Sequence, residues 1–173
     1  MPNIDHEELK KRLSVKLHEN DIRELCSLCA DRDEQEFLYQ LMFEEDKRVG
    51  DNAAWVLNHL TKDDGGWLVA RRDELIDAVM KTPSTTRRRF ILSLLERMDF
   101  PASKLRKDFL EACFAWLMSN NEPPGVRTFS MKIAYKLCFP YPELLAQLRS
   151  MLEQLDPSQL SMGVKCARRK ILS

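Results

Sequence analysis

The stretch that decides the fold is KRVGDNAAWVLNHLT, residues 47–61. Its apolar side chains occupy positions i, i+4, i+7, i+8 and i+11, namely Val49, Ala53, Val56, Leu57 and Leu60. On a helix these positions form one stripe, and Asp51, Trp55 and Asn58 lie on the opposite side. The sequence therefore predicts an amphipathic helix over residues 47–61.

The same stripe returns further along the chain. A shift of 38 residues (Ala53 to Ile91) places Ile91, Leu94, Leu95 and Met98 on it. A further 39 residues (Ile91 to Ser130) places Val126, Ser130, Ile133, Ala134 and Leu137 there. We expect these second helices of a repeat at 85–99 and 125–138, with a shortened copy near 158–172.

Further helices are expected between and before these copies, and strand patterns are nearly absent. The additional amphipathic segments are 5–17, 20–30, 33–44, 67–80, 103–118 and 142–154. Every strong helix breaker, such as Gly65-Gly66 and Pro123-Pro124, falls between stripes. The prediction is an all-α chain of about nine helices in antiparallel pairs, stacked as a right-handed α-α superhelix.

The residues of the repeat carry a family resemblance. Arg48-Val49, Ala53-Ala54-Trp55-Val56-Leu57 and Leu60 resemble the second helix of a HEAT repeat, and Gly125-Val126-Arg127 with Ala134 and Leu137 resemble it less closely. The resemblance covers residues 33–172. It implies a single HEAT/armadillo-like α-solenoid domain over 1–173, with capping helices at 1–32 and three to four helix pairs at 33–173. Such arrays present an extended concave surface.

The net charge of zero hides an uneven distribution. Residues 1–86 hold 12 basic and 19 acidic residues, whereas residues 87–173 hold 15 and 8. The resulting charges of −7 and +7 are compatible with a polyanion site in the basic half, with end-to-end attraction between chains, or with a solvated surface. We favour the solvated surface, because the basic residues are scattered over several predicted helices.

The location of the protein is predicted from its N-terminus and its apolar content. The sequence begins with no basic segment followed by an apolar one, so we expect no secretory signal and a cytoplasmic location. No apolar run approaches the ~20 residues that span a bilayer, so no membrane partner is expected. The five cysteines should therefore stay reduced.

The residue types that could support catalysis or bind a metal show no catalytic pattern. Cys26-Ser27-Leu28-Cys29 has the C-x-x-C spacing of redox and zinc sites, but no second such pair follows. The other three cysteines, Cys113, Cys138 and Cys166, are expected on core stripes. We interpret all five cysteines as structural. The three histidines share no motif. We expect no enzyme activity, catalytic residue, metal or cofactor.

The run Arg87-Arg88-Arg89 has two interpretations. It is compatible with a phosphate or acidic-peptide site, but three consecutive side chains fan around a helix and cannot all face one partner. A solvated face is the favoured interpretation. The run also lies close to a helix N-terminus, where positive charge is mildly unfavourable.

The register of the repeat predicts one binding ridge, on the side of each second helix away from its stripe. The ridge residues are Asp51, Trp55 and Asn58, then Arg89, Ser93 and Glu96, then Thr128, Lys132 and Tyr135. Its charge changes from acidic to basic, and Trp55 either packs on a neighbouring helix or is an exposed anchor. The favoured function is a non-enzymatic scaffold that binds a protein partner. The alternatives are a nucleic-acid-binding protein related to HEAT-like alkylpurine DNA glycosylases, and an enzyme that uses the cysteines.

Overall fold

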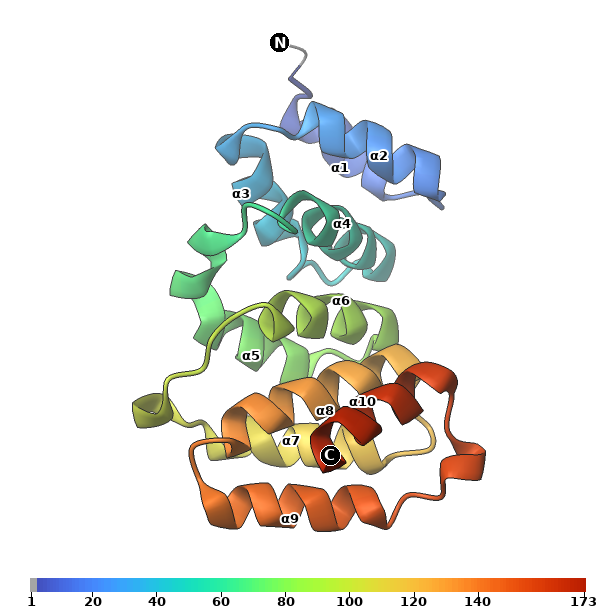
Figure 1. Cartoon of the computed structure of the whole chain (residues 1–173). Coiled ribbons are helices and arrows are strands. Elements are labelled where there is room, and N and C mark those ends of the chain that lie inside the picture. The colour runs from blue at the N-terminus through green and yellow to red at the C-terminus, as the bar shows by residue number, and fades with distance from the viewer. Residues whose placement is uncertain (1–2) are drawn as a thin grey trace. The chain divides into compact units, whose positions relative to one another are not determined.

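A computed structural model describes residues 3–173, and all the secondary structure in this part of the chain is helical, as predicted (Figure 1). Its α-helices are α1 (His6–Leu13), α2 (Glu19–Leu28), α3 (Arg32–Leu41), α4 (Lys47–Leu60), α5 (Arg72–Lys81), α6 (Thr85–Glu96), α7 (Lys107–Met118), α8 (Pro124–Cys138), α9 (Pro142–Glu153) and α10 (Met162–Leu172). Three short 3-10 helices, η1 (Gly66–Arg71), η2 (Ala102–Lys104) and η3 (Pro157–Gln159), precede α5, α7 and α10. Packing between neighbouring helices is that of a helical repeat.

The described chain forms two compact units. The first contains the described residues up to Leu94, and the second is Leu95–Ser173. Helix α6 crosses from one to the other, since it ends at Glu96. One continuous domain over 1–173, with capping helices at 1–32 and helix pairs at 33–173, stays a prediction.

The first unit is built around α4. Helix α3 packs against α4, and α1 and α2 also contact α4. Four of the five stripe residues of α4 are buried: Val49 is 2% exposed, and Ala53, Val56 and Leu57 are fully buried. The fifth, Leu60, is half-buried. The helix begins where Asp46 caps it, because the carboxylate of Asp46 accepts a hydrogen bond from the backbone N–H of Val49 at 3.1 Å.

The second unit is built around α8, which packs against α7, α9 and α10. Val126, Ile133 and Ala134 of α8 are fully buried, as the repeat predicts. Both α8 and α9 begin with a proline, at Pro124 and Pro142, because the missing N–H of proline costs nothing in the first turn of a helix.

The predicted helix ends differ by four or five residues at four places, two of which are the end of α1 at Leu13 and the start of α7 at Lys107. Residues 66–71 form η1, so only the second part of the predicted helix 67–80 is α-helical. The last helix begins at Met162 instead of near 158, because Pro157 lies in η3 and Ser161 caps α10. The hydroxyl of Ser161 accepts a hydrogen bond from the N–H of Val164 at 3.3 Å.

Candidate binding surface on the first unit

Asp51 of α4 and Arg87 of α6 form a largely buried ion pair. The Nε of Arg87 donates to Oδ1 of Asp51 at 3.1 Å, and the two side chains are 11% and 9% exposed. The hydroxyl of Ser84 donates to both carboxylate oxygens of Asp51, at 2.8 and 3.0 Å. Lys47 adds a contact of 2.7 Å from the solvent side. Asp51 therefore faces α6, and its carboxylate has four short contacts within the unit.

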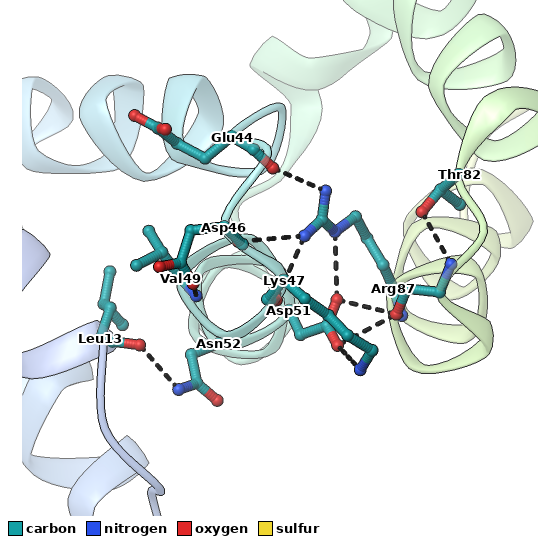
Figure 2. Close-up of polar contacts among 10 residues, drawn as sticks. Leu13, Glu44, Asp46, Lys47, Val49, Asp51, Asn52, Thr82 and Arg87 are labelled. Atoms are coloured by element: carbon teal, nitrogen blue, oxygen red, sulfur yellow. Dashed lines mark hydrogen bonds and ion pairs between the residues drawn. The ribbon is translucent and has the colours of Figure 1, made fainter.

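The remaining nitrogens of Arg87 hold the turn that precedes α4. Figure 2 shows the guanidinium reaching the backbone carbonyl oxygens of Glu44 at 3.1 Å and Lys47 at 3.2 Å. A longer bond of 3.5 Å goes to Asp46. These charge-assisted bonds join the α3–α4 turn to α6.

The three arginines of the run have three different environments, so the interpretation of the whole run as a solvated face is wrong. Arg87 pairs with Asp51 and donates to the α3–α4 turn. The Nη2 of the half-buried Arg88 donates to the carbonyl oxygen of Thr82 at 3.1 Å. Only Arg89 is exposed. The run thus supplies structural bonds with its first two members and leaves the third at the surface.

Asn58 makes a second contact between α4 and α6. Its Nδ2 donates to the backbone carbonyl oxygen of Phe90 at 3.2 Å. Because Asn58 and Asp51 are 8% and 7% exposed, they have little surface left for a partner. The structure gives both residues a packing role, and a direct contact with a partner stays a prediction.

Two predicted ridge residues meet at the ring of Phe90. The half-buried ring of Trp55 stacks on Phe90 with centroids 6.0 Å apart and an interplanar angle of 12°. On α6, the guanidinium of Arg89 lies 4.8 Å from the centroid of the Phe90 ring. We call Trp55 and Arg89, which meet over the buried ring of Phe90, the α4–α6 surface. Sequence reasoning missed Phe90, although its place directly after Arg89 was the available signal.

The other predicted residues are divided between the two units. Ser93 belongs to the first unit, and Glu96, Lys132 and Tyr135 are half-buried in the second unit. The ring of Tyr135 meets the exposed ring of Phe139 edge to face, with centroids 5.7 Å apart. One ridge that runs over both units stays a prediction.

A hollow of about 720 Å³ opens beside Arg87, where the α3–α4 and α5–α6 turns meet. Its exposed apolar member is Phe43, which is 44% exposed. The lining residues are Met42, Phe43, Glu44, Glu45, Lys47, Ala78, Lys81, Thr82, Pro83, Ser84 and Arg87. Lys47, Ser84 and Arg87 therefore line the hollow and also make the contacts with Asp51 described above.

The buried cysteines are poorly suited to chemistry at neutral pH. Burial raises the pKa of Cys29 to about 12, with a smaller contribution from the charge of Glu34, and burial raises the pKa of Cys138 to about 11. Burial also raises the pKa of Cys113. Such thiols stay protonated, whereas nucleophiles and metal ligands are thiolates. Within residues 3–173, no group of three His, Cys, Asp or Glu side chains could hold a metal ion.

Cys166 was predicted on a core stripe, and this prediction is wrong because the thiol is exposed. The buried residues of α10 are Val164, Ala167 and Ile171. At 100° per residue, Cys166 lies about 200° from Val164, on the far side of that stripe.

The histidines have separate local environments. His6 stacks on Phe37 with ring centroids 4.0 Å apart. The backbone N–H of His18 donates to Asp21 at 2.8 Å where α2 begins. His59 lies in the last turn of α4, where the helix dipole stabilises a positively charged side chain. The three residues belong to three different helix ends or faces, and none shares a site with another.

The stacked helix pairs define a helical-repeat protein. A family model described as a HEAT repeat domain matches residues 9–173, and the chain belongs to this family. The match confirms the resemblance and extends it to α1 and α2, which precede residue 33. No curated protein and no solved structure that was compared matches the chain. HEAT repeats generally serve as protein-interaction scaffolds. Among the described residues, no helix is long and apolar enough to cross a membrane.

Proposed function

We propose that this chain is a non-enzymatic adaptor that binds a protein partner through the α4–α6 surface. The observation that carries the proposal is the convergence of Trp55 and Arg89 on the ring of Phe90. Tryptophan and arginine are enriched among the residues that dominate binding energy at protein interfaces. The general scaffold role of HEAT repeats supports the same conclusion.

The packing beneath this surface supports tight binding. The backbone of Phe90 is held by Asn58, and the start of α6 is held by the Asp51–Arg87 ion pair. Because these bonds already fix α6 against α4, binding at Trp55 and Arg89 requires little additional ordering of the protein. A surface ordered in advance loses less conformational entropy when the partner binds.

In the second unit, we propose that Glu96, Lys132 and Tyr135 contact the partner. All three side chains are half-buried, and the exposed ring of Phe139 extends the aromatic surface of Tyr135. The cytoplasmic location that the sequence predicts belongs to the same proposal.

The test is a quantitative capture of partners from the native lysate by the wild-type chain and by Trp55→Ala and Arg89→Glu variants. Two control variants, Arg48→Glu and Val69→Ala, change exposed residues of the same unit outside the α4–α6 surface. We expect at least one protein that both test variants lose and both control variants retain. Retention of every partner by Trp55→Ala and Arg89→Glu overturns the assignment.

Duplex DNA is the second arm of this test, because nucleic-acid binding is the main alternative. We expect no gel shift that depends on Arg89 at low salt, where phosphate contacts are strongest. A shift that Arg89→Glu abolishes, together with unchanged protein capture, would favour the nucleic-acid function and contradict the adaptor.

A further inference from the structure

The last helix of the second unit carries an uncompensated basic face. Between Pro157 and Ser173 the sequence has four cationic residues and no aspartate or glutamate. The cations are Lys165, Arg168, Arg169 and Lys170. Three of them, Lys165, Arg168 and Arg169, line a hollow of about 370 Å³ together with Pro157, Leu172 and Ser173.

The three cations share one side of α10, because positions i, i+3 and i+4 are neighbours on a helix surface. Arg168 is held in place by α9, since its Nε donates to the carbonyl oxygen of Leu152 at 2.8 Å. That bond leaves the two terminal nitrogens of Arg168 without a partner in the described chain. A fixed guanidinium with free terminal nitrogens is suited to bind a phosphate through two parallel hydrogen bonds.

The fold explains the charges of this face only in part. Within residues 3–173, none of Lys165, Arg169 and Lys170 forms an ion pair. The helix dipole favours Arg169 and Lys170, which lie in the last turn of α10, but Lys165 lies near the first turn, where the dipole disfavours a cation. Lys165 and Arg169 also repel one another as an i, i+4 pair of like charge. An anion in the hollow would offset both costs.

We propose that this hollow binds a small, multiply charged ligand that carries phosphate groups. Its volume lies within the roughly 300–1,000 Å³ that is typical of small-molecule sites. The half-buried Lys165 and the exposed Arg169 supply charge, and Arg168 supplies the oriented fork.

The probe for the test is inorganic tripolyphosphate, titrated into the full chain by calorimetry and by thermal unfolding. Sulfate at matched ionic strength is the reference anion. We expect saturable binding of tripolyphosphate and an unfolding temperature that rises with its concentration. Lys165→Gln and Arg169→Gln should each raise the Kd about tenfold, because each removes one charge-assisted contact.

Lys170→Gln is the matched control, since Lys170 is exposed on the same helix but does not line the hollow. It should change the Kd less than about twofold, as expected for a screened charge outside the site. Circular dichroism verifies that all three surface variants remain folded.

Three results would overturn the proposal. One is the absence of saturable binding. Another is an equal loss of affinity in Lys170→Gln and Arg169→Gln, because this would indicate diffuse charge instead of a site. The third is duplex DNA binding that tripolyphosphate fails to displace, because this would make the face a nucleic-acid surface.

Discussion

Gly50 and the guanidinium of Arg87 lie in such close contact that no side chain fits between them. A Cβ atom on Gly50 would lie 2.0 Å from Nη2 and 2.3 Å from Cζ of Arg87. Glycine inside a helix costs roughly 1 kcal/mol relative to alanine. In α4 the absence of a side chain at Gly50 allows Arg87 to reach both Asp51 and the carbonyl oxygens of the preceding turn.

The effect of Gly50→Ala should therefore change sign with the residue at position 87. In the wild-type chain we expect the free energy of unfolding to fall by about 2 kcal/mol, because the new methyl group displaces Arg87 from its bonds. In an Arg87→Ala background the same change should raise it by about 1 kcal/mol, through helix propensity alone. Urea unfolding of the four chains measures both values. Equal effects in the two backgrounds would show that Gly50 and Arg87 do not interact.

Loss of the Arg87 charge should be far more costly than loss of the Lys47 charge, although both contact Asp51. Arg87→Met leaves a buried carboxylate without its main partner and should lower the free energy of unfolding by about 3 kcal/mol or more. Lys47 is 71% exposed, so Lys47→Met should cost less than about 1 kcal/mol. Equilibrium urea unfolding compares the two variants. Similar losses would contradict the claim that burial decides the strength of these contacts.

The five cysteines should differ in their reaction with iodoacetamide at neutral pH. Cys166 is exposed and should be modified first, and the half-buried Cys26 should follow more slowly. Cys29, Cys113 and Cys138 are buried, so their modification should require unfolding. Peptide mass spectrometry over a time course gives the order. Early modification of Cys113 in the folded chain would be inconsistent with the packing of α7 against α8.

The raised pKa values of Cys29 and Cys138 predict a loss of stability at alkaline pH. Both thiols ionise near 9 when exposed, but only at about 12 and about 11 in the folded chain. The folded state therefore holds these protons when the unfolded state has lost them, and stability falls as pH rises above about 9. Their contribution is fully present below that pH. In urea unfolding from pH 7 to 10.5, a Cys29→Ala, Cys138→Ala variant should show a shallower decline than the wild-type chain, and parallel declines would count against this cause.

The helices were predictable because their signals are local. The stripe from Val49 to Leu60 needs only the period of a helix, and α4 covers all but one residue of the predicted range 47–61. The start of α10 was harder to predict, because both Pro157 and Ser161 are residues that can begin a helix. The wrong placement of Cys166 does not depend on where the helix starts, because its offset of about 200° from Val164 follows from the helix period alone.

The partners of Arg87 were not predictable, because they lie 36 to 43 residues away and three of them are backbone carbonyl groups. A carbonyl oxygen has no signature in the sequence. The packing of two ridge residues was not predictable for a related reason: Asp51 and Asn58 were placed opposite the apolar stripe of α4, and this side packs against α6. Trp55 and Arg89 remain the predicted residues that reach the surface at that contact.

The most direct test of the adaptor is a calorimetric titration of the purified partner from the capture experiment into the wild-type chain and into Trp55→Ala. Loss of a tryptophan at the centre of an interface costs about 2 kcal/mol or more, which is about a 30-fold rise in Kd. We predict a rise of at least this size for Trp55→Ala, and a Kd within about twofold of wild type for Val69→Ala. A Kd for Trp55→Ala that equals the wild-type value would contradict the proposal that the α4–α6 surface binds the partner.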